Sequence, residues 1–146
     1  IITPTAQTDD ATREFLQDFW ENLGMRVCSM SPTQHDRVLA RISHLPHVLA
    51  AALVNCSAPR EMLLCGRGFL DTTRIASGPP QVWRDILMTN AANTAAALDK
   101  FIQELRRMEK ALRTGDERTV MKQLCQAQAR RNDLVEKKMQ RKELPA

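Results

Sequence analysis

The sequence predicts an all-α fold. Strong helix formers such as Ala, Leu, Met, Glu, Gln and Arg are abundant, while the 146 residues include only five glycines and no tyrosine. Apolar residues recur at spacings of three and four, the period of one helix face. Residues that begin and end helices stand between these apolar runs. The length is that of one domain with a core of its own.

Residues 1–8 predict a junction between domains. Two β-branched apolar residues are followed by Thr-Pro-Thr, as at the end of a strand that enters a linker. The initiator methionine is also missing. We therefore expect a fragment cut just after a preceding domain, with a helical domain over residues 9–146.

The first helix should begin at Asp9 or Asp10 and stop at Gly24, with a short extended piece over residues 25–30. Ser31-Pro32-Thr33-Gln34 then predicts a capping box at the start of a second helix. Proline cannot donate the helical hydrogen bond, so Pro46 should kink this helix. Its predicted apolar face consists of Val38, Ile42, Leu45, Leu49 and Leu53.

The second half predicts two short helices and then two long ones. The short helices begin near Pro59 and Gly68. A single helix over residues 80–114 should end at Gly115, and Asp116 should cap the last helix. The apolar stripe of the first long helix is formed by Leu98, Phe101, Ile102, Leu105, Met108 and Leu112. Long antiparallel helices with such stripes predict a two-fold homodimer.

Composition argues against several classes of protein. The net charge of +4 comes largely from a C-terminal third with no aromatic residue after Phe101, which disfavours a nucleic-acid-binding surface. No stretch was expected to approach the roughly 20 apolar residues of a membrane span, and no signal peptide opens the chain. The four scattered cysteines predict reduced thiols in a cytoplasmic protein.

Two polar clusters are not needed by a helical fold and therefore predict a site. The first, residues 35–47, contains all three histidines. His44 and His47 could share a metal ion with a third ligand, for which His35 or Asp36 is nearest in sequence. The chain has neither an H-E-x-x-H pattern nor a cysteine partner for them, so we predict no metal site. Two interpretations of His47 stay open: a bond to backbone freed by Pro46, or an imidazole that donates to an oxyanion.

The second cluster, residues 68–85, supplies a candidate arginine and a candidate aromatic wall. Arg74 could pair with Asp71 within one helix, or grip a carboxylate with its planar fork. Trp83 could serve packing alone, or wall a pocket for a cyclic substrate. Gly66-Arg67-Gly68 lacks a preceding strand and a third glycine, so a dinucleotide-binding loop is rejected.

Together these segments resemble the C-terminal domain of the prephenate dehydrogenase family, which includes arogenate and cyclohexadienyl dehydrogenases. The resemblance covers about residues 1–112. It rests on the runs His35-Asp36, Ser43-His44-Leu45-Pro46-His47, Gly68-Phe69, Thr73-Arg74-Ile75-Ala76, Trp83-Arg84-Asp85-Ile86 and Asn90, with Thr3-Pro4-Thr5 at the family's interdomain junction.

The resemblance implies a helical dimerisation domain of the 6-phosphogluconate dehydrogenase C-terminal-like type. It implies that the full-length enzyme oxidatively decarboxylates prephenate to 4-hydroxyphenylpyruvate in tyrosine biosynthesis. NAD or NADP would bind a Rossmann domain absent from this chain, which would also hold the catalytic histidine. The fragment alone would then bind no cofactor and be inactive, and would contact neither nucleic acid nor membrane.

The resemblance also assigns roles to residues. Arg74 resembles the arginine that pairs with a substrate carboxylate, His47 the histidine that bonds the substrate, and Trp83 the tryptophan that lines its pocket. Gly68 is implied to line the same pocket, supported by His44 and Asp71. Arg67 stands where relatives often carry a small residue. Open alternatives are an arogenate or dual-specificity cyclohexadienyl dehydrogenase and, in another class, a stand-alone helical interaction or nucleic-acid-binding module.

Overall fold

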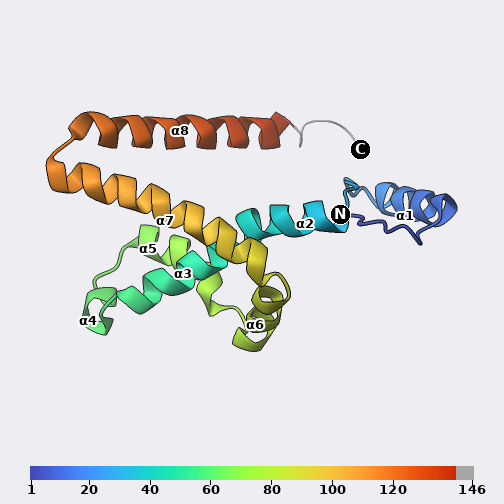
Figure 1. Ribbon diagram of the computed structural model, residues 1–146, viewed down its shortest axis with the longest axis horizontal. Coiled ribbons are helices and arrows are strands. Elements are labelled where there is room, and N and C mark those ends of the chain that lie inside the picture. The colour runs from blue at the N-terminus through green and yellow to red at the C-terminus, as the bar shows by residue number, and fades with distance from the viewer. Residues whose placement is uncertain (141–146) are drawn as a thin grey trace. The chain divides into compact units, whose positions relative to one another are not determined.

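The computed structural model describes residues 1–140 and confirms the all-α fold (Figure 1). The chain divides into two compact units, Ile1–Asp99 and the residues from Lys100 onward. Helix α7 (Ala91–Thr114) contains the boundary between them. The described elements are α1 (Asp10–Asn22), α2 (Pro32–Leu39), the π-helical η1 (Ala40–His44), α3 (Leu45–Cys56), α4 (Pro59–Met62), α5 (Arg67–Thr73), the 3₁₀-helical η2 (Arg74–Ser77), α6 (Pro80–Thr89), α7 (Ala91–Thr114) and α8 (Glu117–Gln140).

Helix α1 begins and ends where the sequence predicts. The Asp9 carboxylate accepts the Thr12 backbone N–H at 2.8 Å, and Gly24 follows the helix with a φ of 77°. The two predicted extended pieces pair with each other in a single parallel bridge between Ile2 and Ser29. The domain boundary predicted at residue 8 stays a prediction.

The predicted kink at Pro46 takes the form of a π-helical segment. Ser31 caps α2 by accepting the Gln34 N–H at 3.2 Å. Further along, η1 inserts one extra residue into the helical path, and the Leu45 N–H bonds the Ala40 carbonyl. Pro46 then lies in the first turn of α3, where a missing N–H costs little. The extra residue turns the helix face, so Ile42 is 68% exposed and does not lie on a buried stripe as predicted.

The run over residues 32–56 is long and apolar enough to cross a membrane by length and composition alone, contrary to the expectation from the sequence. In the structure this run is interrupted by η1, and its second half, α3, packs against α5 and η2. Its two most deeply placed polar side chains are His44 and His47, each 6% exposed. The buried residues of this run lie in η1 and α3, while α2 has none.

The prediction of one helix over residues 80–114 is wrong. The helical path breaks at Asn90, whose φ of −122° and ψ of 34° are not helical, and α6 and α7 are separate helices. Asn90 precedes the first turn of α7, and its carbonyl accepts the Thr94 N–H at 3.0 Å. Its side-chain amide donates to the Asp36 carbonyl of α2, and its side-chain oxygen accepts from the Asn93 amide in the first turn of α7. Asparagine is among the preferred residues at such a helix start.

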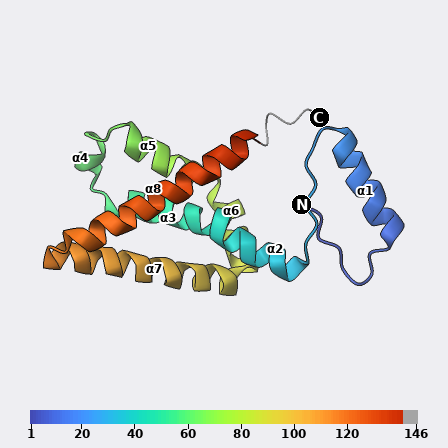
Figure 2. The same ribbon diagram turned by 90° about the horizontal axis from the view of Figure 1, so that it is seen from above.

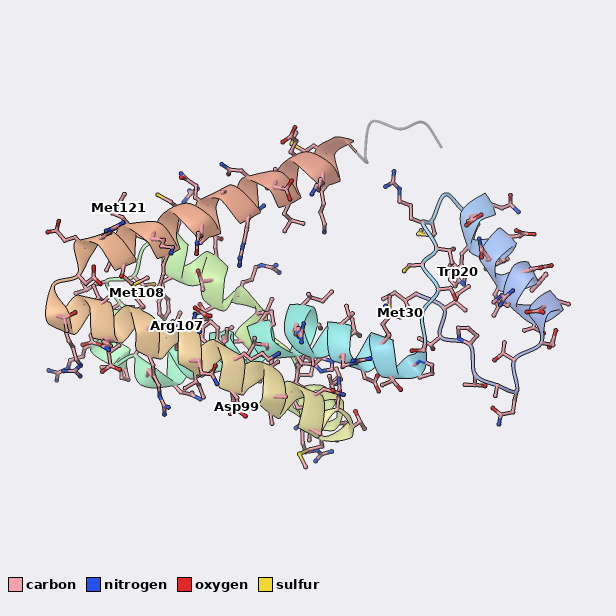
Figure 3. The ribbon with its side chains drawn as sticks, turned by 45° about the horizontal axis from the view of Figure 1, so that its top comes forward. Trp20, Met30, Asp99, Arg107, Met108 and Met121 are labelled. Carbon is pink, nitrogen blue, oxygen red and sulfur yellow. The ribbon has the colours of Figure 1, made fainter. Side chains whose placement is uncertain are left out.

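The C-terminal end of α7 and α8 form a hairpin around Gly115, as predicted (Figures 1 and 2). Gly115 has a φ of 65°, and Asp116 caps α8 through the Thr119 N–H at 3.0 Å and its hydroxyl at 2.7 Å. These bonds from Thr119 lower the pKa of the Asp116 carboxyl. Large apolar side chains stay exposed on both helices, among them Met121, drawn on α8 in Figure 3.

Candidate functional site

His47 and Trp83 form a face-to-face stack between α3 and α6. Their ring centroids lie 3.5 Å apart and the ring planes are inclined by 10°. The π-helical segment and Pro46 place His47 on the inner side of α3, where it is 6% exposed. Pro80 starts α6, which carries Trp83 in its first turn. The structure therefore brings together two of the predicted site residues, 36 positions apart in the sequence.

Gly78 lies against the edge of this stack. A Cβ atom on Gly78 would stand 2.6 Å from Trp83 Nε1, 3.0 Å from Trp83 Cδ1 and 3.3 Å from His47 Cε1. The backbone of Gly78, with a φ of −63° and a ψ of 155°, is one that any residue can adopt. Glycine is therefore needed here for space. The sequence suggested only that Gly78-Pro79-Pro80 ends a helix, and nothing in that motif pointed to the stack.

The two ring nitrogens of His47 have different surroundings. Nδ1 is buried and has no hydrogen-bond partner among the described residues. Burial lowers the pKa of His47, because it disfavours the charged imidazolium. The neutral ring is therefore the form that the folded chain favours near neutral pH.

His44, predicted as a supporting residue, belongs to a buried polar cluster with Asn90 and Thr94. Its Nδ1 lies 3.3 Å from the Asn90 amide nitrogen and 3.3 Å from the Thr94 hydroxyl. The Asn90 amide also donates to the Asp36 carbonyl at 2.8 Å, which joins the start of α7 to α2. Burial lowers the pKa of His44; the negative charge of Asp36 opposes this shift and the neighbouring His35 adds to it.

The sequence missed Asn90 and Thr94 as members of this cluster. A signal was present, because Thr89-Asn90 is a typical helix-starting pair within a run assigned to a single helix. For His44 the sequence suggested a shared metal ion or a hydrogen bond to backbone freed by Pro46, and the structure shows neither contact among the described residues. The Nδ1 contacts of His44 are with side chains. Within the described residues no three His, Cys, Asp or Glu side chains gather as metal ligands would.

Arg74, Asp71 and Gly68 lie together on the α5–η2 segment, which packs against α3. Arg74 is the first residue of η2 and is exposed. No ion pair joins it to Asp71, so the intrahelical pair considered from the sequence is not formed among the described side chains. Gly68 is exposed, with open space around the position of a Cβ atom. Arg74 thus keeps a guanidinium available to a ligand.

The loop Gly66-Arg67-Gly68 does not have the structural setting of a dinucleotide-binding turn. This loop leads into the seven-residue helix α5 and follows the short helix α4. A dinucleotide turn instead joins a strand to a helix. The described residues bring together an aromatic stack and buried histidines on α3 and α6, with an exposed arginine on a segment that packs against α3.

Comparison with known proteins agrees with this architecture. Residues 31–126 match the family model described as "Prephenate dehydrogenase, dimerization domain". A cyclohexadienyl dehydrogenase from Zymomonas mobilis is 37% identical over 123 residues, which cover 80% of this chain and 42% of that protein. The structure of prephenate dehydrogenase from A. aeolicus in complex with hydroxyphenyl propionate and NAD+ superposes with a TM-score of 0.82 at 34% identity, covering 90% of this chain and 48% of that one.

Synechocystis arogenate dehydrogenase superposes with a TM-score of 0.79 at 26% identity, over 90% of this chain and 50% of that one. The chain thus spans about half the length of these relatives. The match to the family model extends from the cap of α2 into α8 and includes the stack, the buried cluster and the hairpin. The chain belongs to the prephenate dehydrogenase dimerisation-domain family.

Proposed function

We propose that this chain is the dimerising, substrate-binding half of an NAD- or NADP-dependent prephenate dehydrogenase. The reaction would be the oxidative decarboxylation of prephenate to 4-hydroxyphenylpyruvate in tyrosine biosynthesis. The observation that carries the proposal is the His47–Trp83 stack beside the arginine-bearing α5–η2 segment in a chain of this family. A relative of the same fold is complexed with hydroxyphenyl propionate, an aromatic carboxylate.

The chemistry of prephenate suits these residues. It carries one carboxylate on its six-membered ring and a second on its pyruvyl side chain, and an arginine fork binds a carboxylate through two parallel hydrogen bonds. Arg74 is the proposed partner of one carboxylate, and the neutral His47 ring the proposed donor to the substrate. The indole of Trp83 offers an apolar wall to the ring. A wall that excludes water also strengthens the charge–charge contacts of Arg74.

The hydride acceptor would be supplied by the nicotinamide cofactor, bound outside the residues of this chain. What this chain contributes is binding, orientation of the ring and exclusion of water. Arogenate is the second candidate substrate, because relatives of the same fold are an arogenate and a cyclohexadienyl dehydrogenase. We further propose that two copies of the chain pair through the exposed apolar faces of α7 and α8.

The test is the rate of NAD or NADP reduction with prephenate and with arogenate, using the enzyme that contains this chain together with its cofactor domain. Arg74→Ala should raise KM for the preferred substrate by the equivalent of about 2–4 kcal/mol, since a carboxylate loses its partner in a closed site. Arg60→Ala is the matched control, an exposed arginine of α4 outside the proposed site.

Two results would overturn the proposal. One is dehydrogenase activity from the 146-residue chain by itself. The other is an Arg74→Ala enzyme whose KM equals that of the Arg60→Ala control.

A further inference from the structure

The backbone of Gly78 lies at the edge of the His47–Trp83 stack. A Cβ atom added to Gly78 would be 2.6 Å from Trp83 Nε1 and 3.3 Å from His47 Cε1. Carbon atoms in ordinary contact stay about 3.5–4.0 Å apart. A methyl group at this position therefore cannot coexist with both rings where they lie. The Gly78 backbone is free of strain, so clearance is what the glycine provides.

We propose that Gly78 is a positioning residue that lets Trp83 lie flat on His47, and that this stack fixes His47 as a neutral ring with its proton on Nε2. The role given to the Nε2 proton, a hydrogen bond to an anionic substrate, rests on the proposed function. The geometry of the stack and the position of the proton do not depend on it.

The position of the proton follows from the two ring nitrogens. Nδ1 is buried without a partner, and a buried N–H group without an acceptor is rare and costly. An imidazolium would carry N–H on both nitrogens, so it would add an unpaired charge to the same cost. The neutral form with Nδ1 bare and Nε2 protonated avoids both penalties. Nε2 is then the nitrogen of His47 that can donate.

The stack maintains this arrangement by holding the imidazole in its buried position. A ring nitrogen makes its hydrogen bond in the plane of the ring, and this in-plane position of Nδ1 is buried. The indole, which lies on one face of the imidazole at 3.5 Å, keeps the ring in that place. If Trp83 is displaced, the imidazole can move and water can reach Nδ1 as donor or acceptor. Both tautomers and the charged ring then become accessible. His44 differs here, because its Nδ1 already has Asn90 and Thr94 as partners.

The first experiment reads the tautomer directly. Side-chain ¹⁵N NMR of the protein separates bare, protonated and charged ring nitrogens for its three histidines, and His47→Gln identifies the His47 signals. We expect the wild-type His47 to show a bare Nδ1 and a protonated Nε2 near neutral pH. Gly78→Ala should replace this pattern by a mixture of tautomers and shift the His47 Cε1–H signal, since the indole ring current no longer reaches it.

Gly66→Ala is the matched control, because open space surrounds the position of its Cβ and its φ is −90°. It should leave the His47 signals unchanged. A wild-type His47 protonated on Nδ1 would overturn the proposal. So would Gly78→Ala with His47 signals identical to those of the wild type.

A second experiment covers the case in which Gly78→Ala folds poorly. Trp83→Leu removes the indole atoms that a Cβ on Gly78 would strike, so Gly78→Ala should shift Tm far less in the Trp83→Leu background than in the wild type. Equal shifts in both backgrounds would overturn the positioning role. Neither experiment needs turnover. If the enzyme were inactive on prephenate and arogenate, the proposed function would be wrong, but the NMR and Tm results would still test the role of Gly78.

Discussion

The two units of the chain bury different kinds of side chain. In Ile1–Asp99 the deeply buried residues include five polar ones, His44, His47, Thr73, Asn90 and Thr94. In the described part of the unit from Lys100 onward, Ala111 is the buried side chain, while Leu105, Leu112 and Leu124 are each more than half exposed. Both units leave large apolar side chains exposed, with Leu63 at 85% and Leu64 at 88% in the first, so the buried polar side chains are what distinguish the first unit.

This difference separates two tasks. Buried polar groups cost free energy unless they are paired, so a small unit keeps them where they hold a specific geometry. Uncovered leucines on a long hairpin cost free energy in water and are typical of a surface that another protein covers. In the proposed function the first unit contains the binding site and the second the dimer interface, and each of these assignments can be tested separately.

The largest expected effect is on the interface. Leu105→Asp with Leu112→Asp should dissociate the proposed dimer, because two-fold symmetry removes four leucines at once, each worth about 1.5–3 kcal/mol. The dimer dissociation constant should rise by several orders of magnitude, as measured by analytical ultracentrifugation. Gln103→Asp, placed by helical spacing on the opposite face of α7, should leave it unchanged. A double variant that sediments like the wild type would contradict an interface on this face.

A smaller effect is expected in the polar interior. Asn90→Ala removes the amide that donates to the Asp36 carbonyl and contacts His44, which should lower the free energy of unfolding by about 1–3 kcal/mol in urea denaturation. Asn132→Ala, at an exposed position of α8, should change it by less than about 0.5 kcal/mol. If Asn90→Ala and Asn132→Ala lowered the free energy of unfolding equally, the buried polar contacts would not distinguish the first unit from the second.

The smallest effect concerns pH. Burial lowers the pKa of His44 in the folded chain, so the unfolded chain binds the proton first as the pH falls. The stability contributed by the neutral ring is present above about pH 6.5 and is lost as the pH falls from there through the lower folded pKa. Native-state hydrogen exchange should therefore show α3 losing protection in mild acid while α8 does not, since all three histidines precede residue 48. His44→Asn should reduce this loss of protection in α3. Equal loss of protection in α3 and α8 would contradict the role of His44.

Helix ends were the part of the fold that local sequence could predict. Asp9, Ser31, Asp116, Gly24 and Gly115 act within one turn of their own position, so a short stretch of sequence contains all the partners involved. The break at Asn90 was not predictable in this way. It depends on a hydrogen bond to Asp36, 54 residues away, which a periodic apolar pattern does not encode.

The candidate site divides in the same manner. His47 and Trp83 stood out as residue types that a helical bundle does not require, and the structure places their rings together. Gly78 could not be found from sequence, because its importance lies in the clearance that it leaves at the edge of two rings brought together by the tertiary fold. The exposure of Ile42 was missed because one extra residue in η1 rotates the face that a regular helical period assigns.

The break at Asn90 also decides which side chains share a rigid helix. An unbroken helix from residue 80 to residue 114 would carry Trp83 and Thr94 on the same rod. With α6 and α7 separate, Trp83 is positioned by α6 and by its stack on His47, while Asn90 and Thr94 at the start of α7 contact His44. A substitution that disturbs the start of α7 should therefore alter the surroundings of His44 and leave the aromatic stack in place.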